Sequence, residues 1–439
     1  MSSSALDREL FESAVRAMPA DQLTSVRNEA ANRFATFGFP TARNEDWKYT
    51  KLSEAANISN AWLREHAGSL SATAPQPSPD TVHPEVMDQI DAHWLVIRNG
   101  SIDLSSLDRL RSGMSSGIAI SRLSEEPGIG DINVDDPMSA FNAALLLDGL
   151  KLSVGENVEI SKPLGILQID DPAHQTSQAR VVINLGANSR LQVVECVLSA
   201  GSGAQFSNSV TEVTLAAGSR LQFVRIQRRN QEHLGVNRMI AKLDRDASFS
   251  HNAFDFGGAL TRNDVVVNID GQNASALLHG LYLASGKQHI DNHTRVEHRV
   301  GPATSHEEYR GILNDRSRCV FNGQAVVFEG ADGTDANQAN HNLLLSDHAE
   351  IDTKPELEIY ADDVKCSHGA TVGQLDESSL FYLRSRGLDQ EAARHLLTQA
   401  FAAGILSQLA VEECRDYLVN AIDTRLSELL DTKSRERTG

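Results

Sequence analysis

A cysteine and a histidine stand one residue apart in residues 365–376, which read Lys-Cys-Ser-His-Gly-Ala-Thr-Val-Gly-Gln-Leu-Asp. The Cys366 thiolate and the His368 imidazole are ligands that iron and zinc prefer, and the same pair could serve as a nucleophile and a base. Two ligands do not complete a tetrahedral site. Three interpretations therefore stay open: other parts of the fold supply the remaining ligands, a partner chain supplies them, or the pair binds no metal.

A second group of potential metal ligands consists of four histidines that occur close together: His289, His293, His298 and His306. On a helix, the first two would share a face and could chelate a metal. On a strand, residues four apart also share a face but are separated by about 13 Å, which is too far for one ion. Because this part of the sequence has the pattern of strands, we do not expect a metal there.

The composition excludes several classes of protein. The net charge of −19, from 40 basic and 59 acidic residues, disfavours nucleic acid and anionic membranes as partners. The sequence starts without the features of a signal or transit peptide, and no run approaches the roughly 18 apolar residues of a membrane span. The four cysteines are widely spaced, which argues against a disulfide framework and for a cytoplasmic protein. Cys196 and Cys319 lie in apolar strand-like stretches and Cys414 lies on the last predicted helix, and all three are expected in the core.

The elements that would position the Cys366 and His368 pair begin with a helical N-terminal region, residues 1–85. Apolar residues recur there at spacings of three and four. Residues 43–50 form a polar segment in which Trp47 could stack on a nucleobase or flavin, although packing on the domain surface is commoner. The Pro- and Ser-rich residues 69–84 are expected to be a flexible loop. A mixed connecting region follows at residues 86–150.

Residues 151–370 have a strand-and-turn pattern with an internal repeat. Residues 185–194 recur at 215–224 with their leucines in the same places, and weaker copies start at Leu243 and Leu345. A period near 30 residues is typical of a solenoid or a propeller, but a propeller blade needs about 40 to 45. We therefore predict a β-helix core in which apolar residues of successive coils stack as interior ladders.

Residues 371–439 are expected to form a C-terminal helical domain. Gly387 has the position of a helix end and Asp389 that of the next helix start. The apolar faces of these helices are more often core than docking surface, yet a partner could share them. The predicted fold is thus mainly β, a β-helix flanked by N-terminal and C-terminal α-helical parts.

Longer motifs around Cys366 and His368 resemble the SufD branch of the SufB/SufD family, which belongs to the SUF iron–sulfur cluster assembly system. The residues that carry the resemblance are 291–298, 309–313, 321–323, 338–346, 352–376 and 380–387, with an outlying match at 43–50. The detailed similarity is continuous from about residue 290 to 400. Between about residues 60 and 280, only the strand-rich pattern of the sequence agrees with the family.

The resemblance implies a scaffold subunit and not an enzyme, with SufB and the ATPase SufC as partners. The C-terminal helices would hold SufC, and the last β-helix coils would meet SufB. His368 would face a SufB cysteine where the nascent cluster forms, with Cys366 beside it. No tightly bound cofactor is implied, only a transient iron–sulfur cluster at this interface. A reduced flavin on the complex and a homodimer of this chain stay open.

Two other functions remain as alternatives. A purely structural adaptor would hold the ATPase without contributing a cluster ligand. A β-helix could also be a polysaccharide-active enzyme, but such enzymes act outside the cell and offer aromatic platforms, whereas aromatic residues make up 5% of this chain. The sequence has no Gly-x-x-x-x-Gly-Lys-Ser/Thr loop, so we do not expect it to hydrolyse ATP.

Overall fold

The computed structural model of the chain describes residues 6–66, 85–114, 116–126, 132–171 and 175–431. The loop predicted at residues 69–84 lies outside them. Among the described residues, no helix is both long and apolar enough to cross a membrane.

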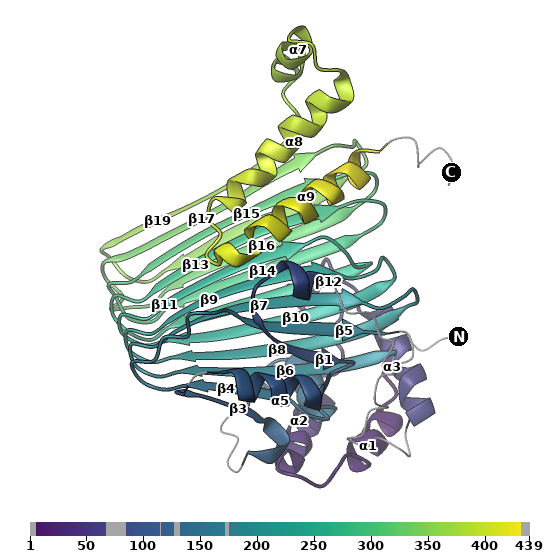
Figure 1. Ribbon diagram of the computed structural model, residues 1–439, viewed down its shortest axis with the longest axis vertical. Coiled ribbons are helices and arrows are strands. Elements are labelled where there is room, and N and C mark those ends of the chain that lie inside the picture. The colour runs from purple at the N-terminus through teal and green to yellow at the C-terminus, as the bar shows by residue number, and fades with distance from the viewer. Residues whose placement is uncertain (1–5, 67–84, 115, 127–131, 172–174, 432–439) are drawn as a thin grey trace.

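Most of the described chain forms a β-solenoid with two facing sheets (Figure 1), which confirms the predicted fold class. Sheet A contains, in spatial order, β19 (Val364–Gly373), β17 (Thr334–Leu344), β15 (Thr304–Leu313), β13 (Ser275–Ala284), β11 (Ser248–Asp255), β9 (Arg220–Arg228), β7 (Arg190–Ser199), β5 (Leu164–Asp170), β1 (His93–Arg98) and β2 (Ser101–Ile102). Sheet B contains β18 (Glu350–Ile359), β16 (Arg318–Val327), β14 (His289–His298), β12 (Leu260–Ile269), β10 (His233–Leu243), β8 (Gln205–Leu215), β6 (Thr176–Leu185), β4 (Leu150–Val154) and β3 (Ile118–Arg122). From β4 onward, consecutive strands alternate between the sheets, so each coil contributes one strand to each.

The internal repeat of the sequence is the stacking of successive coils. Leu191 on β7 pairs in parallel with Leu221 on β9, which pairs in turn with Phe249 on β11. These three side chains point between the sheets and are at most 2% exposed. Because stacked strands lie about 4.8 Å apart, equivalent side chains form the continuous apolar ladder that the repeat predicts.

The turns between sheets B and A explain the polar residues that separate the strands. Asn157, Asn188, Asp246 and Asn273 all have φ between 56° and 60°, a left-handed conformation that Asn and Asp tolerate better than most residues. The side chains of neighbouring turns also bond to one another, Asn188 to Asn157 at 3.1 Å and Asn273 to Asp246 at 3.2 Å. The turns therefore stack as the strands do.

The N-terminal helices cover the outer face of sheet B. They are α1 (Arg8–Arg16), α2 (Thr24–Phe37), α3 (Ser53–His66) and α6 (Pro137–Ala144), with the short η1 (Glu45–Trp47) between α2 and α3. Their apolar side chains share one cluster with Phe206, Leu234 and Leu260 of the sheet. Trp47 is buried, and the Arg262 guanidinium lies 4.4 Å from the centre of its ring. Trp47 therefore packs on the domain surface, the commoner of the two alternatives for this segment.

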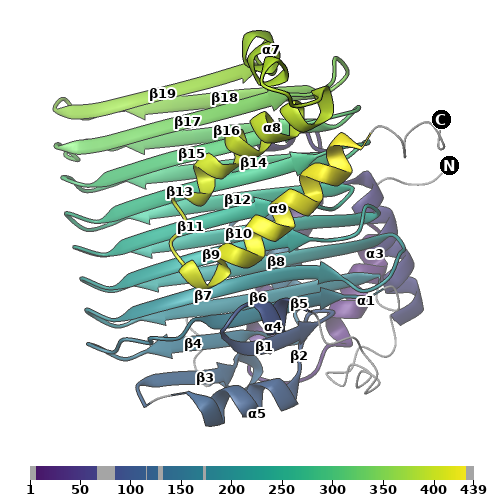
Figure 2. The ribbon, with the colours of Figure 1, turned by 45° about the horizontal axis from the view of Figure 1, so that its top comes forward.

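The C-terminal helices cover the opposite face of the solenoid, the outer face of sheet A (Figure 2). They are α8 (Gln390–Leu406) and α9 (Arg415–Leu430), with η3 (Glu412–Cys414) before α9. The short α4 (Val86–Gln89) joins the same apolar cluster. Helix α7 (Glu377–Ser385) instead contacts α8 and extends beyond the solenoid (Figure 1). The Asp389 side chain accepts a hydrogen bond from the Ala392 backbone at 2.8 Å and so caps the start of α8, as the sequence indicates.

The two ends of the solenoid differ. At the first end, β1 and β3 from residues 86–150 extend the two sheets, and α5 (Leu104–Gly113) closes the interior with Leu107 and Leu110. The short η2 (Leu123–Glu125) follows β3. At the last end, formed by β18 and β19, no described element lies over the interior in this way. The open end is where the candidate functional site lies.

Candidate functional site

The open end of the solenoid consists of two edge strands. β18 and β19 are the last members of their sheets, and no other described strand pairs with their outer edges. Most β19 side chains are exposed, whereas the inward side chains of the preceding coils are buried. The backbone of both strands is therefore available to another β-structure.

Cys366 and His368 lie on β19 in this open end. Cys366 pairs with Ala336 on β17, and His368 pairs with Gln338. Ala336 and Gln338 are buried between the sheets, so the register places the Cys366 and His368 positions on the inward side of β19. Because no further coil covers them, Cys366 is only half-buried and His368 is exposed.

The described residues do not supply the remaining ligands of a metal site. Among them, no group of three or more His, Cys, Asp or Glu side chains is arranged to hold a metal ion. Partial burial raises the pKa of the Cys366 thiol, and the Asp335 carboxylate adds to the rise, while a backbone hydrogen bond with Ala336 opposes it. A raised pKa reduces the fraction of thiolate, which is the form of cysteine that binds metals.

Two further polar residues lie behind His368, and the sequence patterns did not single them out. Gln338 occupies the same inward position one coil deeper, and Glu307 occupies it two coils deeper. Both are buried. Burial raises the pKa of the Glu307 carboxyl to about 7, although Thr294 and Gln338 act in the opposite direction. What identifies both residues is their position on the inward side of paired strands, in register with His368, and this is visible only in the structure.

The four histidines at residues 289–306 are divided among different surfaces. On the outer side of sheet B, His289 contacts the Thr50 hydroxyl at 2.7 Å and His293 contacts Asp291 at 3.0 Å. His298 points inward and bonds to Ser305 at 2.8 Å, whereas His306 lies on sheet A. His289 and His293 are linked through Thr50 and Asp291, whereas His298 and His306 lie elsewhere, so the four histidines do not converge on one site.

The three remaining cysteines are in the core, as predicted. Cys196, Cys319 and Cys414 have no exposed surface and no disulfide. Burial raises the pKa of each thiol, to about 12 for Cys414. Buried thiols with raised pKa values are poor nucleophiles and poor ligands.

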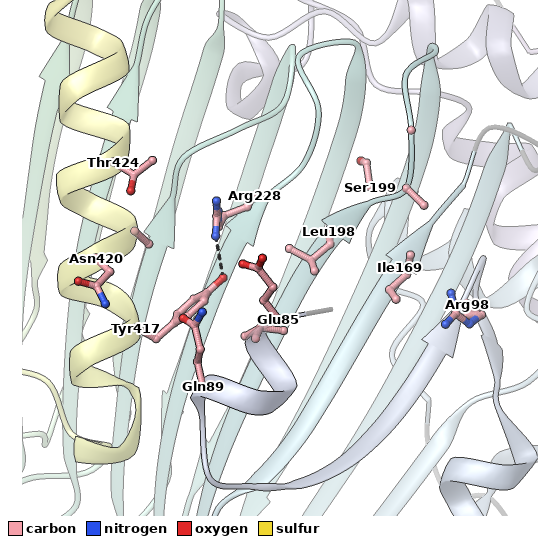
Figure 3. A pocket seen from close by; sticks show the side chains of 14 residues that line it. Glu85, Gln89, Arg98, Ile169, Leu198, Ser199, Arg228, Tyr417, Asn420 and Thr424 are labelled. Atoms are coloured by element: carbon pink, nitrogen blue, oxygen red, sulfur yellow. Dashed lines mark hydrogen bonds between the residues drawn. The ribbon is translucent and has the colours of Figure 1, made fainter. Parts of the chain in front are cut away.

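A cavity of about 660 Å³ lies between α4, α9 and the strands of the first coils (Figure 3). Arg98, Arg228 and Glu85 line it together with apolar side chains, and Arg228 donates a hydrogen bond to the Tyr417 hydroxyl at 3.0 Å. Because its strands are β5, β7 and β9, the cavity is several coils away from β19. It is therefore separate from the site at the open end.

Comparison with known proteins agrees with this architecture. The family description "SUF system FeS cluster assembly, SufBD core domain" matches residues 167–401, and "SufBD protein N-terminal region" matches residues 8–71. The first match covers the solenoid from β5 to β19 together with α7 and most of α8. The second covers α1, α2, η1 and α3 on the outer face of sheet B but not α6.

Individual relatives extend over nearly the whole chain. The iron–sulfur cluster assembly protein SufD of Escherichia coli (strain K12) is 31% identical over 399 residues, which is 89% of this chain and 90% of the relative. An iron–sulfur cluster assembly SufBD family protein of Synechocystis is 27% identical, and the match covers 96% of each chain. SufD of Bacillus subtilis is 26% identical over 67% of this chain and 68% of its own. The chain therefore belongs to the SufBD family of iron–sulfur cluster assembly proteins of the SUF system.

Proposed function

We propose that this chain is a non-catalytic scaffold subunit that pairs with SufB through the open end of its solenoid and binds the ATPase SufC through α7 and α8. His368 is the ligand that it contributes to a nascent iron–sulfur cluster. The observation that carries the proposal is the position of His368, which lies on the inward side of an edge strand that no described coil covers. The cluster is cargo here and not a resident cofactor.

The edge strands have the properties of a protein interface. Val372 of β19 is 50% exposed although its position faces inward, and Ile359 at the end of β18 is 41% exposed. Tyr360 directly after β18 is 63% exposed. Apolar side chains beside unpaired backbone groups favour pairing with another β-structure, which would supply hydrogen bonds and cover the apolar groups at once. A paralogous solenoid with a similar end would fit this edge.

A separate apolar surface lies on the C-terminal helices. Phe381 and Tyr382 on α7 are 74% and 57% exposed, and Leu396 on α8 is 43% exposed. Helix α7 extends beyond the solenoid (Figure 1). Exposed aromatic residues are typical anchors of protein interfaces, so this surface supports the assignment of α7 and α8 to the ATPase.

The chemistry of the proposed site follows from its division between two chains. An imidazole from this chain and a thiolate from SufB would together provide ligands that iron accepts. Because each chain holds only part of the ligand set, separating the chains would open the site and release the cluster. Nucleotide-driven motion of SufC would provide that separation.

The experiment compares complexes of SufB and SufC with the wild-type chain, with His368→Ala and with His348→Ala. His348 is an exposed histidine in the turn before β18, at the same end of the solenoid. It does not lie on the inward side of a strand as His368 does, so its substitution is the matched control. Size-exclusion chromatography would report assembly, and iron and acid-labile sulfide per complex would report the cluster.

We expect all three complexes to assemble and only His368→Ala to lose its cluster. Normal cluster content in His368→Ala would refute the ligand role of His368, and the purely structural adaptor would be the remaining hypothesis. Failure of the wild-type chain to bind SufB and SufC would contradict the scaffold assignment itself.

A further inference from the structure

The inward column that ends at His368 contains two more polar residues. Glu307 on β15, Gln338 on β17 and His368 on β19 are direct register partners, so each lies one strand spacing, about 4.8 Å, from the next. Glu307 is 1% exposed and Gln338 is 5% exposed. The partner of Glu307 on its other side is the buried Leu278. The polar column therefore runs from the open end to a depth of two coils and stops against the apolar core.

The opposite sheet leaves room for this column. Thr294 on β14 and Gly323 on β16 are register partners on the inward side of sheet B. A Cβ atom at Gly323 would lie 3.3 Å from Glu307 Oε2 and 2.9 Å from Phe321 Cζ. A glycine at this position thus gives the Glu307 carboxyl the space that a larger residue would occupy.

The buried polar atoms of the column form no hydrogen bond of good geometry, although Thr294 and Gln338 lie close enough to the Glu307 carboxyl to lower its pKa. This holds for both carboxyl oxygens of Glu307, both amide atoms of Gln338 and the Thr294 hydroxyl. By contrast, Asn340 and Asn342, the next inward residues on the strand of Gln338, both bond to the Tyr282 hydroxyl. These atoms therefore retain hydrogen-bonding capacity, and leaving a buried polar group unpaired costs about 1 to 3 kcal/mol.

We propose that Gln338 and Glu307 are positioning residues for His368. The Gln338 carbonyl oxygen accepts a hydrogen bond from one ring nitrogen of His368, and the Gln338 amide group donates to the Glu307 carboxylate. The second ring nitrogen of His368 then faces out of the solenoid with a free lone pair. This inference rests on the proposed ligand role of His368 and adds the means by which the ring is oriented.

We call this chain of hydrogen bonds from Glu307 through Gln338 to His368 the relay. Its direction follows from hydrogen-bonding chemistry. Above its pKa of about 7 the Glu307 carboxyl is ionised and can only accept hydrogen bonds, so in this form it requires the Gln338 amide group to point toward it. The Gln338 oxygen must then point toward His368, where it can only accept. Histidines that bind metals commonly donate their other ring N–H to a fixed acceptor, which selects the tautomer and orients the ring.

The test measures the tautomer of His368 in the free, full-length chain, where no cluster is needed. Nitrogen-15 spectra of histidine-labelled protein report which ring nitrogen carries the proton, and the His368 signals are assigned by their loss in His368→Gln. We expect one tautomer in the wild type and a mixture of both in Gln338→Met, which keeps the side-chain length but removes the carbonyl acceptor.

Two further variants provide a control and a second, independent test. Asn337→Ala changes the neighbouring residue on the same strand, whose side chain faces outward and bonds to Ser367, and should leave the His368 signals unchanged. Glu307→Gln removes the acceptor-only group without changing its size, so it should also produce both tautomers. It serves in place of Gln338→Met if that variant does not fold.

The same variants are then combined with SufB and SufC. We expect Gln338→Met to assemble normally and to form cluster about 10- to 100-fold more slowly, the usual effect of removing a group that orients a metal ligand. Unchanged His368 ring signals in both Gln338→Met and Glu307→Gln would overturn the relay, even if His368→Ala abolishes the cluster. Altered ring signals together with normal cluster content in His368→Ala would support the relay and refute the proposed ligand role.

Discussion

The Glu307 carboxyl should make the stability of the solenoid depend on pH near neutrality. Burial raises its pKa from 4.5 to about 7. A carboxyl whose pKa is raised in the folded state contributes stability that is fully present below its unfolded pKa and is lost as the pH rises through the folded value. Replacing Glu307 with Gln keeps the shape of the side chain and removes the ionisation, so the variant should not show this loss.

The size of the effect follows from the two pKa values. A difference of roughly 2.5 units, at 1.36 kcal/mol per unit, corresponds to a total of about 3 kcal/mol. Most of this change, about 2.5 kcal/mol, falls between pH 5 and pH 8. Relative to the wild type, Glu307→Gln should therefore gain about 2.5 kcal/mol of unfolding free energy as the pH is raised across this range.

Urea-induced unfolding of both proteins at several pH values, followed by tryptophan fluorescence, measures this difference. Other titrating groups are common to both proteins, so their contributions cancel in the comparison. Glu308→Gln is the control, because Glu308 faces outward and pairs with Arg310 at 2.7 Å. A constant difference between Glu307→Gln and the wild type from pH 5 to pH 8 would refute the account of the buried carboxyl.

Two other expectations concern the core and the proposed ATPase surface. Phe249→Ala removes a fully buried ring from the interior ladder and should cost about 3 to 5 kcal/mol of unfolding free energy, measured by urea unfolding. A cost below about 1 kcal/mol would contradict the stacked-ladder description. The double substitution Phe381→Ala and Tyr382→Ala should weaken SufC binding about 30-fold or more in calorimetry, since each exposed aromatic is a candidate anchor. Thermal stability should hardly change, and unaltered affinity would exclude α7 from the interface.

The solenoid could be predicted from the sequence because its best-preserved coils have equal length. Leu191 pairs with Leu221, 30 residues later. Other coils differ: Phe249 pairs with Ala276 after 27 residues, and Ser305 pairs with Ala336 after 31. Because the coils differ in length, the repeat is no longer regular along the sequence, although the strands remain in register. The pairing of the strands in two sheets is therefore visible only in three dimensions.

The candidate site could be predicted in part, because two of its residues are close together in the sequence. Cys366 and His368 are two residues apart on one strand, and their place just before the C-terminal helices was evident from the change of pattern. Glu307 and Gln338 were missed because they are far apart in the sequence. Glu307 is also followed by Glu308, and only the strand register distinguishes the inward carboxyl from the outward one.

The path of α8 and α9 has a mechanical consequence. Arg310 on β15 donates a hydrogen bond to the Phe401 carbonyl of α8 at 2.8 Å, and Arg425 of α9 donates to Gln288 at 2.6 Å. Both helices also contact β13, while α7 contacts α8. Only residues 374–376 separate β19 from α7, so a load applied to α7 would enter the solenoid at β19 as well as at the coils that α8 and α9 contact. The helices would link the strand that carries Cys366 and His368 to coils deeper in the solenoid, so a pull on α7 would tilt this open end relative to a partner attached to it.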